Sequence, residues 1–288
     1  MCLFARSFAL AVVVLGLLTA CSNMPLVERV QLADSIATAG EMVPTTIDGG
    51  LPLTGYLRRS SIPVNRLRIY IEGDGFAFVT STSPSLDPTP IDPVALRLAA
   101  ADPFEHVLYL ARPCQFIDAR ANRCPERFWT THRYSREVLE LYHRALETLQ
   151  SQFGVNEFDL IGYSGGGAIA ALLAAERDDV SNLITIAANL DLDAFNRHHN
   201  AAAMPHSLNP ADFAGSIANL PQFHLVGEDD RIVPASVVRS FLRQQKLPNE
   251  VEKARLLIVP NAQHSGPWSP AWLRILESTK PRWIWSTR

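Results

Sequence analysis

The chain has no long run of charge of either sign and no internal repeat. Its 288 residues include 26 basic and 29 acidic side chains, which leaves a net charge of -3. Proteins that bind nucleic acid or an anionic membrane surface through charge gather basic residues on one face or in one segment. The sequence therefore predicts neither a nucleic-acid partner nor a polybasic membrane contact.

Long hydrophobic runs are also scarce. The one near the start, Phe8 to Leu18, is too short to span a bilayer comfortably, follows Arg6, and is followed by small residues. This pattern predicts an export signal over residues 1–20. The next motif, Leu18-Thr19-Ala20-Cys21, resembles the lipobox of bacterial lipoproteins. The resemblance implies that Cys21 is acylated and tethers the protein to a membrane; an ordinary signal peptide with a chance cysteine is the alternative.

The two residues after Cys21 bear on location. They are Ser22 and Asn23, and neither is the aspartate that the lipoprotein pattern associates with retention in the inner membrane. By this resemblance, we expect the protein at the outer membrane, facing the periplasm, with residues 21–43 as a lipidated tether.

Cysteine is rare, and its positions agree with export. Of four cysteines, Cys2 would leave with the signal and Cys21 would carry lipid. Cys114 and Cys124 remain, in the turn-rich segment RPCQFIDARANRCPERF. An oxidising compartment favours a disulfide between such a pair, closing a short loop near the site.

Metal-ligand spacings are absent. Neither His106 nor His132 stands at a ligand spacing from the late cysteines, so half a metal site is the weaker interpretation of that pair. His198, His199 and His206 lie in one segment without a cysteine or carboxylate at fixed spacing. The sequence predicts no metal site and no cofactor.

What the sequence does contain is an alternation of strands and helices over residues 44–288. With 47% hydrophobic residues there is material for one sizeable core. Periodicity predicts strands near 45–47, 53–57, 67–72, 107–110, 158–161, 183–187, 223–226 and 255–259, and helices near 93–101, 136–153, 235–245 and 269–278. The first two strands read as a hairpin. Such alternation predicts one α/β domain with a mostly parallel sheet. Residues 189–220 show no strong period and are predicted to form a small lid-like insertion.

The most informative stretch is NEFDLIGYSGGGAIAALLAAE, residues 156–176. A strand runs into a sharp turn with Ser164 between Gly162 and Gly166, and a helix follows at once. This order is typical of a nucleophilic serine held on a strained turn, with the free N–H groups of the helix facing a developing oxyanion. A phosphate-binding loop or plain packing would use similar glycines.

A nucleophilic serine needs a base, and the base needs a carboxylate. His264 is the one histidine after the last predicted strand, and Glu228-Asp229-Asp230 follows the strand before it. Parallel strands place both loops at the same edge as Ser164. The spacing alone does not choose among the acids.

At these residues the chain resembles the α/β-hydrolase family, whose order is nucleophile, acid, histidine. Its acid loop, G-x-x-D-x-x-V-P, matches residues 227–234 and selects Asp230, with Asp229 as runner-up. The resemblance implies an α/β-hydrolase fold with helices on both faces of the sheet and a Ser164–Asp230–His264 triad.

The oxyanion should be bound by backbone N–H groups. One is that of Gly165, directly after the serine. The other should come from Asp74 or Gly75, in a loop where many relatives carry His-Gly-x-Gly and this chain has Glu72-Gly73-Asp74-Gly75. The Asp74 carboxylate would oppose catalysis there unless it turns away into a hydrogen-bonded turn.

These residues together predict an exported serine hydrolase that cleaves a carboxylic ester, of a small molecule or a lipid, through an acyl-enzyme. Peptide or amide hydrolysis, thioester cleavage and acyl transfer use the same residues and stay open. A lipoprotein that uses the scaffold only for binding is the non-enzymatic alternative, which the intact trio disfavours.

Overall fold

The structure is a computed structural model that describes residues 24–60 and 65–279. The predicted signal, residues 1–20, and Cys21 lie outside the described residues. Within the described ranges, no helix combines the length and the apolar character that crossing a bilayer requires.

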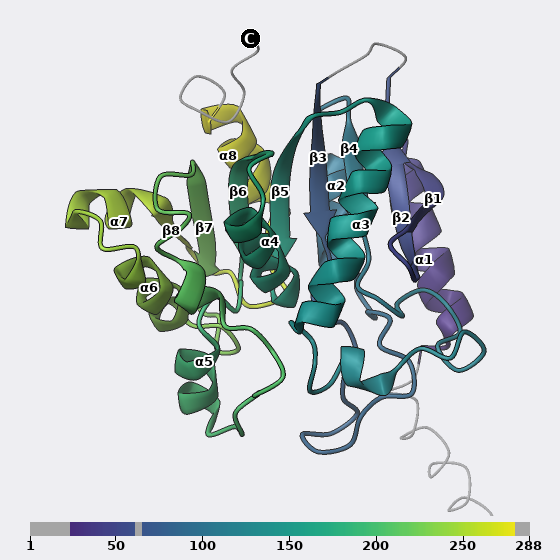
Figure 1. Ribbon diagram of the computed structural model, residues 1–288, viewed down its shortest axis with the longest axis horizontal. Coiled ribbons are helices and arrows are strands. Elements are labelled where there is room, and N and C mark those ends of the chain that lie inside the picture. Colours follow the sequence, from purple (N-terminus) through teal and green to yellow (C-terminus); the bar gives the residue numbers. More distant parts are fainter. Residues whose placement is uncertain (1–23, 61–64, 280–288) are drawn as a thin grey trace, which may run out of the picture.

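One sheet of eight strands organises the molecule (Figure 1). Its spatial order is β1-β2-β4-β3-β5-β6-β7-β8. Strand β2 is antiparallel to both of its neighbours, β1 and β4, and the remaining strands, β4, β3, β5, β6, β7 and β8 in spatial order, run parallel to one another. The strands span Val43–Asp48 (β1), Pro52–Arg58 (β2), Arg66–Ile71 (β3), Val107–Leu110 (β4), Glu157–Tyr163 (β5), Val180–Ile186 (β6), Gln222–Gly227 (β7) and Leu256–Val259 (β8).

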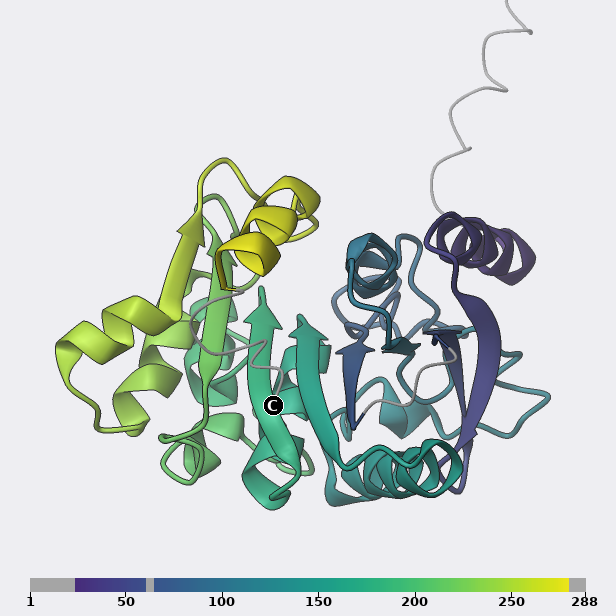
Figure 2. The ribbon, with the colours of Figure 1, turned by 90° about the horizontal axis from the view of Figure 1, so that it is seen from above.

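Helices cover both faces of this sheet. Figure 2 shows α1, α2 and α8 on one face and α3 and α4 on the other. Each face has its own buried apolar cluster, and α6 contributes to the one that contains α3 and α4. The helices span Leu26–Ala39 (α1), Val94–Ala101 (α2), Arg136–Phe153 (α3), Gly165–Glu176 (α4), Leu192–His199 (α5), Ala235–Gln244 (α6), Asn249–Arg255 (α7) and Ser269–Thr279 (α8). Two short 3₁₀ turns, Glu126–Phe128 (η1) and Pro210–Phe213 (η2), complete the elements.

Local chemistry explains the boundaries of the longest helix, α3. The Ser135 hydroxyl accepts a hydrogen bond from the Val138 N–H at 3.3 Å, which caps the first turn. Gly154, with a φ of 69°, ends the helix in the left-handed conformation that glycine adopts without strain. Between these ends one apolar face is buried on the sheet.

The fold predicted from the sequence, an α/β domain with a mostly parallel sheet, is confirmed. Predicted elements and observed ones agree closely at the hairpin, at β4 and at α3, which have the strongest patterns.

Two expectations need correction. Residues 21–43, predicted to be a tether with a short helix, contain the 14-residue helix α1, whose Ala33 and Ala37 are buried against the domain, and β1 begins at Val43. Small alanines on one helical face allow this close packing. In the sequence, such alanines indicate a buried helical face less clearly than a row of leucines does. Helix α7 was not predicted, because none of its residues is buried and it carries no apolar period.

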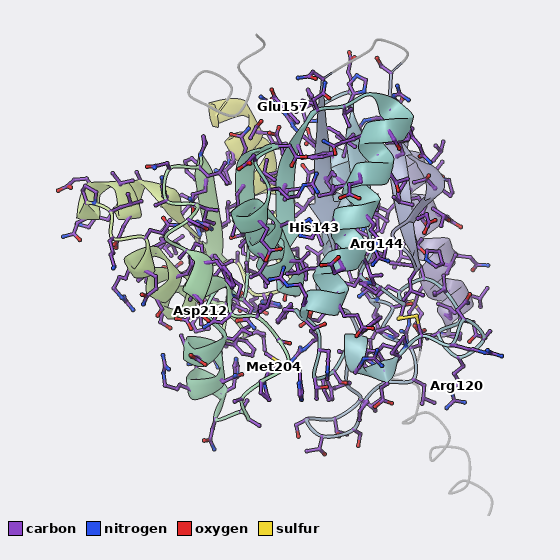
Figure 3. All side chains as sticks on the ribbon, viewed as in Figure 1. Arg120, His143, Arg144, Glu157, Met204 and Asp212 are labelled. Carbon is purple, nitrogen blue, oxygen red and sulfur yellow. A yellow bond between two sulfur atoms is a disulfide. The ribbon has the colours of Figure 1, made fainter. Side chains whose placement is uncertain are left out.

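The insertion over residues 189–220 contacts the loop before α3 through backbone and side-chain groups. It contains α5 and η2, and Leu208 N–H donates to the Tyr134 carbonyl. Met204, labelled in Figure 3, lies 3.2 Å from an Arg133 guanidinium nitrogen through its sulfur. The segment therefore packs beside the carboxyl ends of the strands.

Candidate active site

Ser164 sits on a strained turn between β5 and α4. Its φ of 51° and ψ of -121° are unfavourable for a residue with a side chain. The flanking glycines permit this turn: a Cβ on Gly162 would lie 2.4 Å from the Gly166 carbonyl oxygen, and one on Gly166 would lie 2.2 Å from the Ile71 carbonyl oxygen. The turn holds the serine side chain at the carboxyl edge of the sheet, where it borders a pocket.

The structure brings Ser164, His264 and Asp230 together. The His264 Nε2 lies 3.0 Å from the Ser164 Oγ, and its Nδ1 lies 2.9 Å from the Asp230 Oδ2. A carboxylate only accepts, so Nδ1–H donates to Asp230 and Nε2 of the neutral ring can accept the serine proton. Of the two candidate acids it is therefore Asp230 that contacts His264, whereas Asp229 is exposed and makes no contact of this kind.

The neighbours of this hydrogen-bonded chain fix its orientation. The Asp230 side chain is fully buried, and its Oδ1 accepts the backbone N–H groups of Ile232 and Val233, each at 2.8 Å. The His264 carbonyl oxygen accepts bonds from the Tyr163 hydroxyl and the Trp268 indole. Hydrogen bonds thus fix both the Asp230 carboxylate and the His264 backbone, so the imidazole is oriented before a substrate binds.

Free backbone donors surround the serine. Within the described part of the chain, the N–H groups of Gly165, Asp74 and Gly75 have no hydrogen-bond acceptor. The Gly73 N–H, by contrast, donates to the Glu72 carboxylate at 2.8 Å. A Cβ on Gly73 would lie 3.2 Å from the Ser164 Cβ, so this loop passes directly over the nucleophile.

The carboxylate of Asp74 does not end in a local turn. It pairs with Arg112 at 2.8 Å and Arg133 at 2.7 Å, and accepts the Tyr134 hydroxyl at 2.9 Å. Burial alone would raise the pKa of Asp74, but the two guanidinium groups outweigh it and lower the pKa. The carboxylate also touches Gly165, where a Cβ would lie 2.0 Å from its Oδ1. Two cations against one anion leave this cluster positive, which removes the expected opposition to an oxyanion.

The sequence did not predict Arg112, Arg133 or Tyr134 as part of the site. They stand 38 or more positions from Asp74, in loops without a motif. The sequence offered one indication, which was the acid Asp74 in a loop predicted to bind an oxyanion. Such an acid implies a positively charged partner but does not identify it.

The predicted disulfide between Cys114 and Cys124 is confirmed, with Cα atoms 5.8 Å apart. Next to it, the Gln115 side-chain amide donates to the Gly73 carbonyl at 3.0 Å. The bridge therefore stabilises a loop that in turn holds the backbone above Ser164.

Glu72 occupies the position where many relatives of the resembled family carry histidine. It is 1% exposed, and burial raises the pKa of its carboxyl to about 7, although the Gly73 and Ala95 N–H groups act in the opposite direction. One of its oxygens has no hydrogen-bond partner among the described residues.

A pocket of about 620 Å³ opens over Ser164 and His264. Its walls are mostly apolar side chains with a few polar groups, a composition usual for small-molecule sites. They come from residues 72–78, Pro90, Ile91, Asp92, Arg133, Tyr134, Tyr163, Asn189, Phe195, Ile232 and Val233. The Asn189 Oδ1 is buried in this wall without a partner in the described ranges, and so can accept a bond from a substrate. A larger hollow, about 740 Å³, borders Arg58 and Phe104 and contains none of Ser164, His264 or Asp230.

Metal ligands were not predicted, and the residues described here contain no cluster of three or more His, Cys, Asp or Glu side chains able to hold an ion. His132 and His206 stack on each other, with ring centroids 4.4 Å apart.

Searches by sequence find no family model and no curated protein that matches this chain. Solved structures do match. An α/β serine hydrolase without a lid from Xanthomonas campestris superposes with a TM-score of 0.55 at 16% identity, covering 86% of this chain and 97% of its own. The chain has the α/β-hydrolase fold. An esterase from Pyrococcus furiosus gives a TM-score of 0.59 at 12% identity, covering 84% of this chain and 91% of that one.

Another structural neighbour is named for a different kind of hydrolysis. A puromycin-hydrolysing peptidase from Mycobacterium tuberculosis gives a TM-score of 0.57 at 16% identity, covering 83% of this chain and 38% of that one. Esterases and a peptidase thus share the α/β-hydrolase fold with this chain, and identities this low establish the fold alone.

Proposed function

We propose that this protein is a serine hydrolase that cleaves carboxylic esters through an acyl-enzyme intermediate. The observation that carries the proposal is the hydrogen-bonded chain from Ser164 through His264 to the buried Asp230, on a strained turn that opens into a pocket. A site that served only for binding would not require the serine, histidine and aspartate to stay hydrogen-bonded in this order.

In the proposed reaction, His264 Nε2 accepts the Ser164 proton as the hydroxyl oxygen attacks the ester carbonyl. Asp230 holds the ring in the required tautomer and stabilises the imidazolium. The new oxyanion accepts hydrogen bonds from the Gly165 N–H and from that of Asp74 or Gly75. His264 then gives its proton to the departing alcohol, and water activated by the same imidazole releases the acid.

The surroundings of the oxyanion support this assignment. The free N–H groups belong to the first residue of α4 and to a loop clamped by Arg112 and Arg133. Such donors are fixed before reaction and cost no reorganisation, which is the main source of their catalytic effect. The positive balance of the clamp favours a negative charge on the substrate oxygen.

The proposal also covers export. Residues 1–20 would act as a signal, and Cys21 would be acylated and anchor the enzyme at the outer membrane, facing the periplasm. The lipobox-like motif and a disulfide suited to an oxidising compartment support this. Replacing Cys21 with Ser should release the protein from membranes without loss of turnover; a variant that stays membrane-bound would contradict the anchor.

A panel of p-nitrophenyl esters of graded chain length, beside matched p-nitroanilides, tests the activity. The protein should hydrolyse the esters, and Ser164→Ala should lower kcat on the order of 10⁶-fold. Faster hydrolysis of the anilides would identify a peptidase or amidase. An unchanged rate in Ser164→Ala would refute the proposal.

A further inference from the structure

Exposed apolar side chains gather at the edge that contains the pocket. Among the described residues, eight large apolar side chains are exposed. Five of them, here called the apolar rim, lie in the first turn of α1, in loop 76–92 or in the loop after β7: Val27, Val79, Leu86, Ile91 and Ile232. Ile91 and Ile232 line the pocket itself. Two of the five rim residues therefore border the pocket, and the other three lie in segments at the same edge of the sheet.

Hydrogen bonds hold loop 76–90 in a conformation that leaves Val79 and Leu86 exposed. Val79 N–H donates to the Ser83 carbonyl, Ser85 N–H donates to the Ala77 carbonyl, and the Trp129 indole donates to the Ser85 carbonyl. In this frame Val79 is 56% and Leu86 62% exposed. Apolar side chains that stay exposed on an ordered loop indicate a surface that binds a membrane or another molecule.

Charge is missing from the part of this loop that carries Val79 and Leu86. From Gly75 to Leu86 the sequence reads GFAFVTSTSPSL, without an acid or a base. Entry into the headgroup and acyl boundary of a bilayer therefore desolvates no charged side chain of this segment.

The described chain begins at this edge. The Arg29 guanidinium donates to the Met24 carbonyl at 2.8 Å and to the Thr89 carbonyl at 2.7 Å, and it lies 5.3 Å from the centre of the Phe76 ring. These contacts fasten the first turn of α1 to loop 76–90. Figure 1 shows both at the lower edge of the molecule, where the parallel strands end.

Covalent geometry then limits where a lipid can attach. Cys21 precedes Met24 by three residues. Three residues span at most about 11 Å when fully extended. An acyl group on Cys21 would therefore enter its bilayer within about 11 Å of Met24, which precedes the first turn of α1. That tether is too short for the domain to turn its opposite edge to the lipid.

We propose that the apolar rim lies in the surface of the membrane that carries the Cys21 lipid, and that the pocket takes its ester substrate from that bilayer. The substrate class is thus a membrane-resident acyl ester. This inference rests on the proposed hydrolase activity for the substrate, whereas the orientation itself rests only on the anchor and the rim.

Tryptophan quenching tests the orientation without any turnover. The full, lipid-bearing chain is reconstituted in phosphatidylethanolamine and phosphatidylglycerol vesicles with brominated acyl chains. Val79→Trp is compared with Val43→Trp, because Val43 is 60% exposed and lies at the opposite edge, paired with Leu57. The fluorescence added at position 79 should fall at least about twofold more than that at position 43, because bromine quenches on contact within the acyl region.

Equal quenching at the two positions would overturn the orientation. Quenching at neither position would do the same. Shielding at position 79 without lipid, together with a rise in sedimentation coefficient, would show that a second copy of the chain covers the rim and would also overturn the proposal.

Kinetics test the substrate source. Val79→Ser combined with Leu86→Ser should lower hydrolysis of a long-chain ester lipid dispersed in vesicles about tenfold, because both apolar side chains lose their contact with the bilayer. It should leave turnover of soluble p-nitrophenyl acetate unchanged, as should the control Val43→Ser in both assays. Equal losses in both assays, or none in the vesicle assay, would contradict a bilayer substrate. Absence of soluble-ester turnover in the unmodified protein would instead refute the hydrolase activity, which the quenching result does not require.

Discussion

Glu72 should make the stability of the protein fall as pH rises through neutrality. Burial raises the pKa of its carboxyl from 4.5 to about 7 in the folded state. Between these values the folded protein keeps a proton that the unfolded chain has released, so the unfolding free energy decreases with pH over this window and levels off above it. A difference of that size corresponds to roughly 3 kcal/mol.

Glu72→Gln isolates this contribution, because glutamine resembles the protonated acid and keeps an oxygen for the Gly73 N–H. The variant should be more stable than the parent by roughly 3 kcal/mol at pH 8, and no more stable at pH 4. Urea unfolding followed by tryptophan fluorescence across pH 4 to 8.5 measures the difference, with the exposed Glu140→Gln as control. A gain that does not change with pH, or a parent more stable at pH 8, would refute the reasoning.

Three further changes have definite outcomes. Asp230→Asn should lower kcat on the order of 10⁴-fold because the wrong tautomer is favoured, while Asp229→Asn stays within a few fold; equal effects in an ester assay would show the loop is misassigned. Gly166→Ala places a Cβ 2.2 Å from a backbone carbonyl of β3 and should destabilise by about 3 kcal/mol or more, whereas Gly215→Ala, with open space around it, should be nearly neutral in the same denaturant titration. Cys114→Ser should cost about 2 to 3 kcal/mol by calorimetry, and a change below 0.5 kcal/mol would contradict a stabilising bridge.

Strong local patterns made most of the fold predictable. The apolar stripe of α3, the hairpin with its Asp-Gly-Gly turn and the strand before Ser164 each bury one face or run through the core. The length of helix α1 and its packing on the domain were not predicted, because its buried face carries alanines. Helix α7 was not predicted because none of its residues is buried. Hydrophobic periodicity is produced by large apolar side chains buried on one face, and these two helices have few or none.

The site was predictable where the chain order follows the sheet. Loops after β5, β7 and β8 must meet at one edge of a parallel sheet, so Ser164, Asp230 and His264 could be expected near one another. The choice of Asp230 over Asp229 needed the family pattern, since spacing alone allows both. Arg112 and Arg133 could not be found in advance, because their contact with Asp74 depends on how two irregular loops fold together.

The most direct measurement of the central claim is the mass of the protein after reaction with a fluorophosphonate, followed by location of the adduct in peptides. We expect one phosphonyl group per chain on Ser164, none in Ser164→Ala, and much slower labelling in His264→Ala, because the hydroxyl needs the Nε2 that lies 3.0 Å away. An adduct on another residue, or undiminished labelling of Ser164→Ala, would contradict the assignment of Ser164 as the nucleophile.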